Sequence, residues 1–215
     1  MRSDRRAVLG LAPALAAAAL LGALSAPATA APRDPSRLVV QTTDLGPGFS
    51  KAQGRMRPNA LVARESGVPL ATLKRWGRVS GYEAVYARPV DPTTAQRGAA
   101  TVTAAVSLYR DAAGLRAAHA ASVERFARLA RPRPKPLPAP GRFGAGARMW
   151  ETRFMQDGVR VVTYTIIWRE RGALSHLTVA GLAGRLGAKD AVAIARRQQA
   201  RIATGAAGDG PELVA

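Results

Sequence analysis

The residues able to do chemistry are few: the chain has two histidines, His119 and His176, and no cysteine. A zinc site needs several His, Cys or carboxylate ligands at short spacings, and no His-x-x-x-His or related pattern is present. A Gly-x-Ser-x-Gly elbow and a Ser-x-x-Lys pair are also missing, so nucleophilic catalysis has no local signature. His119 is expected to pack within a helix, and His176 within a strand. We therefore expect no metal, no cofactor and no catalytic residue.

Carboxylates on predicted strands are the candidates for acid-base chemistry, with Glu83 and Glu151 the most prominent. A glycosidase requires two carboxylates roughly 5 to 9 Å apart in a cleft. Glu151 alternates in phase with Arg153, which suits a surface ion pair at least as well as a catalytic acid. One alternative function stays open, namely hydrolysis of a cell-wall or extracellular polymer by Glu151 or Glu83 with His176.

Two basic segments have the composition of anion-binding sites. Gly184, Arg185 and Lys189 lie in a Gly-x-x-Gly-x-x-Gly segment before a predicted helix, where exposed amides and two cations favour phosphate. Arg133 and Lys135 alternate with prolines and could lie along an anionic surface. A plain strand-to-helix loop and a stiff crossover linker explain the same two segments without a ligand.

Large apolar residues occupy both faces of the predicted C-terminal strands. Trp150 lies on one face, while Tyr164 and Trp168 lie on the other. One face must contact helices, and if residues 51–75 leave the other face uncovered, an aromatic surface or pocket results. The predicted ligand-binding residues are Tyr164, Trp168, Trp150 and Arg153, for an apolar or anionic component of the cell envelope. Alternatively, residues 51–75 cover that face as a second layer.

Periodicity and turn residues predict the elements that position these side chains. Asp111 is placed to cap a helix, and Asp157-Gly158 between alternating segments is a strong hairpin signal. The expected connection at 91–94 is polar, and residues 131–141 form a proline-rich extended crossover. The predicted elements are strands at 79–88 and 100–109, a helix at 111–130, strands at 148–155, 159–170 and 173–180, and a helix at 189–203.

This order predicts an α+β fold with one domain. Strands joined by short hairpins, with helices inserted between them, favour a mainly antiparallel sheet of about five or six strands. Two or three helices are expected to pack on one face of this sheet. The hairpin register predicts that Phe154 faces Val161, Ile167 faces His176, and Glu151 faces Tyr164.

The N-terminus is typical of an export signal. Arg5 and Arg6 precede an uncharged segment that runs from residue 7 to 32 and contains Ala28-Thr29-Ala30. The arginine pair favours the twin-arginine route, with general secretion as the alternative. We expect residues 1–30 to be a signal peptide, 31–203 the domain, and 204–215 a disordered tail. Cleavage would leave no membrane span, whereas an uncleaved segment would be an anchor.

The chain is strongly basic, with a formal net charge of +18. Without residues 1–30, 29 basic and 13 acidic residues remain, a net charge of +16. Such a charge favours anionic partners and allows association with anionic surfaces. Over the whole chain, 28 of the 32 basic residues are arginine, a bias that composition alone also explains. No nucleic-acid-binding motif accompanies the charge, so nucleic acid is not an expected partner.

Three local patterns carry a family resemblance: residues 44–49, the junction 108–111 with Leu115 after it, and residues 195–202. Together they resemble uncharacterised secreted and lipoprotein-type α+β domains of actinobacterial cell envelopes, some of them PsbP-like or sensor-like. Such relatives often carry a lipobox cysteine, which is missing here, so a lipid anchor does not follow. The resemblance implies an antiparallel sheet flanked by helices and a non-catalytic role in the envelope.

The expected function is that of an exported, non-enzymatic binding or sensor-like module, secreted or located in the envelope, with an unidentified ligand. The polymer hydrolase described above is the alternative. A third possibility is an interaction partner held near anionic surfaces by its charge alone.

Overall fold

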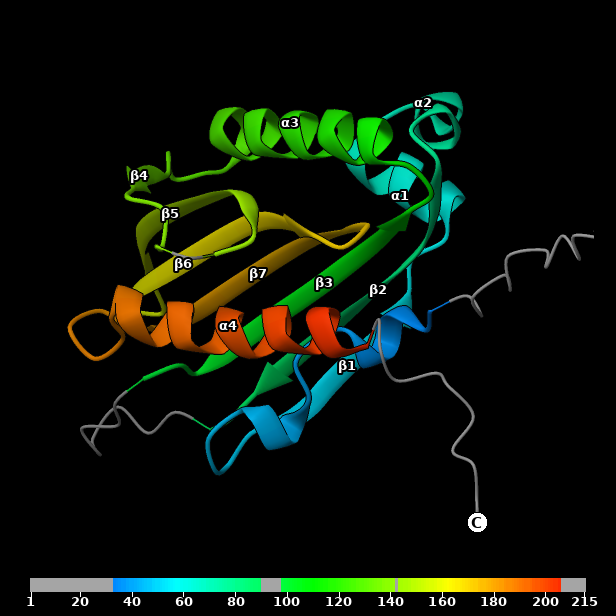
Figure 1. The fold of residues 1–215 in the computed structure, drawn as a ribbon. Coiled ribbons are helices and arrows are strands. Elements are labelled where there is room, and N and C mark those ends of the chain that lie inside the picture. Colours follow the sequence, from blue (N-terminus) through cyan, green and yellow to red (C-terminus); the bar gives the residue numbers. More distant parts are fainter. Residues whose placement is uncertain (1–32, 90–97, 142, 206–215) are drawn as a thin grey trace, which may run out of the picture. The chain divides into compact units, whose positions relative to one another are not determined.

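The predicted hairpin strands form the centre of a seven-stranded sheet in which every pair of neighbours is antiparallel (Figure 1). The structure is a computed structural model and describes residues 33–89, 98–141 and 143–205. The strand order is β1-β2-β3-β7-β6-β5-β4, so β3 joins an N-terminal hairpin to a C-terminal meander. The predicted class, α+β with an antiparallel sheet, is therefore confirmed.

The helices and strands alternate in groups along the chain. In chain order they are the 3-10 helices η1 (Pro35–Arg37) and η2 (Thr42–Asp44), β1 (Ser50–Met56), α1 (Asn59–Ser66), α2 (Leu70–Arg75), β2 (Arg78–Ala87), β3 (Thr101–Tyr109), α3 (Ala112–Leu129), β4 (Lys135–Leu137), β5 (Ala145–Gln156), β6 (Val159–Glu170), β7 (Ala173–Leu182) and α4 (Ala188–Thr204).

The meander has the predicted register. Phe154 pairs with Val161 and Ile167 pairs with His176. Asp157 has a φ of 50° and Gly158 a φ of 76°, the left-handed pair that a two-residue hairpin turn requires. The turn therefore fixes which residues of β5 and β6 lie opposite each other, and through them which residues share a face.

The predicted strand and helix numbers are too low. The strands that were missed, β1 and β4, lie at the two edges of the sheet. β1 is exposed at almost every position, so it has no apolar alternation to detect. β4 lies inside the proline-rich crossover and contains Pro136, which an edge strand tolerates because one side of it needs no partner. The described residues also contain four α-helices, since residues 51–75 hold both α1 and α2.

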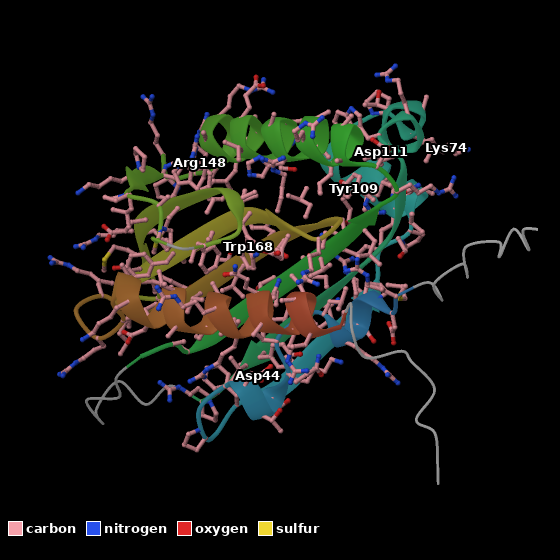
Figure 2. All side chains as sticks on the ribbon, viewed as in Figure 1. Asp44, Lys74, Tyr109, Asp111, Arg148 and Trp168 are labelled. Carbon is pink, nitrogen blue, oxygen red and sulfur yellow. The ribbon has the colours of Figure 1, made fainter. Side chains whose placement is uncertain are left out.

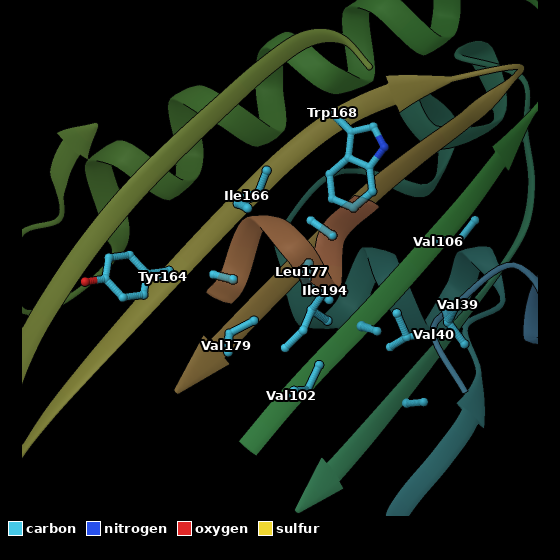
Figure 3. Packing of buried hydrophobic residues seen from close by; sticks show 14 of the residues in the cluster. Val39, Val40, Val102, Val106, Tyr164, Ile166, Trp168, Leu177, Val179 and Ile194 are labelled. Atoms are coloured by element: carbon cyan, nitrogen blue, oxygen red, sulfur yellow. The ribbon is translucent and has the colours of Figure 1, made fainter. Parts of the chain in front are cut away.

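Helices cover both faces of the sheet, whereas the prediction placed them on one. Along β6, Ile166 and Trp168 belong to a core cluster with Ile194 of α4 (Figure 3). Ile167 lies between them in sequence and belongs to a second cluster with Leu115 of α3. Because neighbouring strand residues point to opposite faces, α3 and α4 pack on opposite sides. The central strands are apolar on both faces, and both faces therefore need a covering layer.

The N-terminal segment adds to the α4 layer. The hydroxyl of Tyr86 donates to the carbonyl oxygen of Val40 at 2.6 Å, inside the larger core cluster. Arg201 of α4 pairs with Asp44 of η2. Burial raises the pKa of Asp44, but hydrogen bonds from Arg201 and from the Gln41 N–H outweigh this effect, and the pKa lies below its usual value. These contacts link η1 and η2 to the last helix.

Several predicted segments lie outside the described residues. They are the signal peptide at 1–30, the connection at 91–94 and nearly all of the tail at 204–215. Within the part of the chain that the structure describes, no helix is long and apolar enough to cross a bilayer.

Candidate ligand-binding cavity

A cavity of about 450 Å³ lies between α3 and the sheet. Its floor comes from β3, β6 and β7, its roof from α3, and its side from α1, α2 and the segment between them. The lining runs along α3 from Ala118 to Ala130, which corresponds to about 18 Å of helix axis. A volume between roughly 300 and 1,000 Å³ is typical of small-molecule sites.

The uneven packing of α3, which forms the roof, explains why the cavity is not filled. Leu115 and Ala118, in the first half of α3, are buried against the sheet, but Phe126 is only half-buried and Leu129 is 55% exposed. The ring of Phe126 contacts the ring of Trp150, with centroids 5.0 Å apart. The second half of α3 therefore presents apolar side chains to the cavity instead of to a filled core.

His176 lies on the cavity floor, at the middle of β7. Its neighbours in the adjacent strands are Ala105 and Ile167, and Phe126 contacts it edge-on at 6.0 Å between ring centroids. The ring is deep in the molecule, and this burial lowers the pKa of His176 to about 4. Nevertheless it is the one exposed position of β7, because the cavity opens onto it. At neutral pH it is an uncharged, accessible imidazole.

Arg78 is a buried cation that lines the same cavity as His176. It is 5% exposed and donates to Ser107 Oγ from Nε (3.2 Å) and Nη2 (3.1 Å), and to Asn59 Oδ1 from Nη1 (2.7 Å). Burial lowers its pKa. Gly81 makes room for the guanidinium, because a Cβ there would lie 2.4 Å from Nη2. The partners of Arg78 are neutral groups.

Tyr109 is adjacent to Arg78 in the sheet and ends β3 close to Asp111, where the chain enters α3 (Figure 2). Burial raises the pKa of Tyr109 to about 12, although a hydrogen bond from Arg78 opposes this shift. The hydroxyl is therefore protonated over the physiological range and can donate. It lines the cavity together with Ser107.

A four-residue ion-pair network closes the β1 side of the cavity. Arg57 donates to Glu83 Oε2 and Glu65 Oε2, both at 2.6 Å, while Arg55 binds the other oxygen of each carboxylate at 2.8 and 2.9 Å. The network joins β1, α1 and β2, and its two positive and two negative charges balance. Both carboxylate oxygens of Glu83 therefore accept from guanidinium groups, so this carboxylate is part of a structural network.

The two carboxylates considered for hydrolysis do not converge. Glu83 is in line across the sheet with Ala105 and His176, on the face that carries α3. Glu151 neighbours Trp150 in β5, and Trp150 belongs to the α3 cluster, so Glu151 points to the opposite face. No group of three His, Asp or Glu residues that could hold a metal occurs in the described part of the chain.

The four predicted ligand-binding residues are divided between the two faces. Trp168 is fully buried under α4, with the ring of Phe143 edge-on at 5.0 Å, and Tyr164 is 5% exposed on the same face (Figure 3). Trp150 lies on the α3 face against Phe126. Arg153 is exposed and binds Glu151, which also accepts from the Tyr164 hydroxyl. The structure does not gather these four residues around one space, and none of them lines the cavity between α3 and the sheet.

The predicted anion-binding residues fall into two separate groups. Gly184, Arg185 and Lys189 line a surface hollow before α4, together with Arg153. The amide of Gly187, the N-cap residue of α4, already donates to Asp190 Oδ2 at 2.9 Å. Arg133 and Lys135 are exposed, and Lys135 sits in β4, paired with Glu151 in the sheet register.

The cavity residues that the sequence did not predict include the polar groups Arg78, Ser107 and Tyr109. The sequence did contain a sign of this cavity, because the residues of β2 and β3 that face α3 include the small residues Gly81, Ala105 and Ser107. Large apolar residues would fill such a face if it only met a helix.

Comparisons with known proteins bear on the fold. No family model and no curated protein matches the chain. The extracellular domain of PknH from Mycobacterium tuberculosis matches with a TM-score of 0.54 and 10% identity, over 79% of this chain and 94% of that domain. LpqN, involved in cell envelope biogenesis of the same organism, matches with a TM-score of 0.28 and 16% identity, over 70% of this chain and 82% of LpqN. The chain thus shares the fold of the extracellular domain of PknH.

Proposed function

We propose that the protein is an exported, non-enzymatic binding module that takes up a small ligand between α3 and the sheet. The observation that carries this proposal is the cavity of about 450 Å³ in which His176, at the centre of the sheet, is accessible. Most pockets that bind small molecules combine apolar walls with a few polar groups. Here Trp76, Phe126 and Leu129 supply the apolar walls.

Two further observations support an extracytoplasmic binding role. The fold is that of an extracellular domain, and the uncharged N-terminal segment after Arg5-Arg6 is typical of an export signal. The carboxylate nearest the cavity floor, Glu83, is bound by Arg55 and Arg57. This arrangement favours binding or sensing of a ligand in the envelope over hydrolysis.

A neutral apolar dye tests the proposal directly. N-phenylnaphthylamine should bind the wild-type protein with enhanced emission. Ala121→Trp, on the lining of the cavity, should weaken this binding at least tenfold because the indole occupies the ligand space. Ala120→Trp, exposed on the outer side of the same helix, is the matched control and should bind like the wild type. Failure of the wild type to bind, or equal binding by both variants, would refute the proposal.

A further inference from the structure

The charge of the cavity indicates what kind of ligand it takes. Three arginines line it, Arg57, Arg78 and Arg125, and its described lining includes neither Asp nor Glu. Arg57 is neutralised by its network with Glu65 and Glu83. Neither Arg78 nor Arg125 forms an ion pair with any carboxylate of the described residues. Two positive charges therefore remain without a counter-ion at the cavity wall.

Of these two arginines, Arg78 is the stronger evidence for an anionic ligand, because its charge is buried. A buried charge without an opposite charge is unfavourable, and neutral hydrogen-bond partners compensate for it only in part. Of its five N–H donors, Ser107 and Asn59 accept three and the Tyr109 hydroxyl accepts a further hydrogen bond. At least one guanidinium N–H therefore has no acceptor among the described residues.

Other donors converge on the same place. Ser107 accepts two N–H groups through its oxygen, which leaves its own O–H free to donate. The Tyr109 hydroxyl, protonated at neutral pH, is a second O–H donor beside Arg78. A guanidinium and two hydroxyls form a donor set that suits an oxyanion, whereas a cationic or purely apolar group would leave them unpaired.

Most of the remaining lining is apolar. Trp76, Phe126, Leu129 and Ile167 line it, and the lining follows α3 for about three turns. Resting on the proposed binding function, we infer that the ligand is an anionic amphiphile, with one carboxylate or phosphate group beside Arg78 and Tyr109 and an extended apolar chain under the second half of α3.

A matched series of ligands tests this inference by displacement of N-phenylnaphthylamine below the micelle concentration. Dodecanoate and dodecyl phosphate should displace the dye at concentrations at least about tenfold lower than dodecanol, since a hydrogen bond to a charged group is worth roughly one decade in affinity or more. Dodecyltrimethylammonium should be weaker than dodecanol. The tighter of the two anions identifies the head group as carboxylate or phosphate.

Four variants distinguish binding of the anions at a specific site from their general attraction to a basic protein. Tyr109→Phe should reduce the preference for the anions over dodecanol severalfold, and Tyr164→Phe, on the opposite face, should not change it. Arg125→Gln, in the lining, should also reduce the preference, while Arg128→Gln, exposed on the same helix, should leave it intact. Each pair of variants makes the same substitution inside and outside the site, and far-UV circular dichroism checks that each variant is folded.

The outcomes distinguish this inference from the proposed function. If dye and dodecanol bind but the anions bind no more tightly, the binding function stands and the anionic ligand is wrong. Equal losses for Arg125→Gln and Arg128→Gln would likewise overturn the inference, because surface charge would then explain the preference. If neither dye nor dodecanol binds the wild-type protein, the binding function itself fails.

Discussion

Replacing Gly114 by alanine tests how closely α3 packs against the segment that forms one side of the cavity. Gly114 lies in the first turn of α3, and its N–H donates to the capping carboxylate of Asp111 at 2.6 Å. A Cβ atom at Gly114 would lie 1.9 Å from the carbonyl oxygen of Trp76 and 2.5 Å from its carbonyl carbon. The position of a Cβ is fixed by the helix backbone and the atoms it meets are backbone atoms of Trp76, so no side-chain rotation can relieve the contact.

The expected magnitude follows from two opposing effects. Alanine is favoured over glycine in a helix by about 1 kcal/mol. Overpacking costs about 1 to 3 kcal/mol, and a rigid backbone contact belongs at the upper end of that range. The free energy of unfolding should therefore fall by about 2 kcal/mol, which for a domain of this size lowers Tm by about 4 to 8 °C.

Urea unfolding followed by circular dichroism measures the effect. Gly46→Ala is the control, because a Cβ there meets nothing within 4 Å, and its unfolding free energy should stay within about 0.5 kcal/mol of the wild type. A Gly114→Ala variant as stable as the wild type, or more stable, would show that α3 and the Trp76 backbone are not in contact. The shape of the cavity derived from that contact would then be wrong.

Two further predictions concern pH. Burial and Arg57 lower the pKa of His176 to about 4, against the opposing effect of Glu83, whereas the usual value is near 6.5. As pH falls, the histidine of the unfolded chain therefore takes up a proton before that of the folded protein. The wild type should lose stability between about pH 6.5 and pH 4. Because the imidazole is exposed to the cavity, the expected effect is discounted, and His176→Gln should remove about 1 kcal/mol of this loss. Urea unfolding at pH 7 and pH 4.5 measures it, and an equal loss of stability in both proteins would contradict the prediction. Asp44 has a lowered pKa, so its stabilisation is present above the usual value near 3.9 and disappears as pH falls through the folded value. Asp44→Asn should be about 1.5 kcal/mol less stable at pH 7 and should converge with the wild type near pH 2, whereas a pH-independent difference would argue against the ion pair with Arg201.

The parts of the fold that could be predicted are those with local causes. The Asp157-Gly158 turn fixed the register of β5 and β6, because its two left-handed residues leave only one way to pair the strands. Asp111 marked the start of α3 for a similar reason. β1 and β4 have no such local cause. They are edge strands, one mostly polar and one containing Pro136, and only their neighbours hold them extended.

The cavity could not be predicted in the same way, because its polar groups depend on contacts between distant segments. Arginine is rarely buried, and Arg78 is buried here only because Asn59, Gly81 and Ser107 surround it from three places in the chain. Trp168 was assigned to a binding site on the assumption that helices would cover a single face. α4 covers that face instead, and Trp168 is a core residue.

The sizes of the side chains on the α3 face explain why the space exists at all. At one end of that face Trp150 and Ile167 are large, and Phe126 of α3 packs against Trp150 there. Toward β3 the same face carries Ala105 and Ser107, which are too small to reach a helix whose distance from the sheet is set by the larger residues. A straight helix over a face of unequal height leaves a gap above the short side chains. The accessibility of His176 and the burial of Arg78 therefore have one origin, the small residues of β2 and β3.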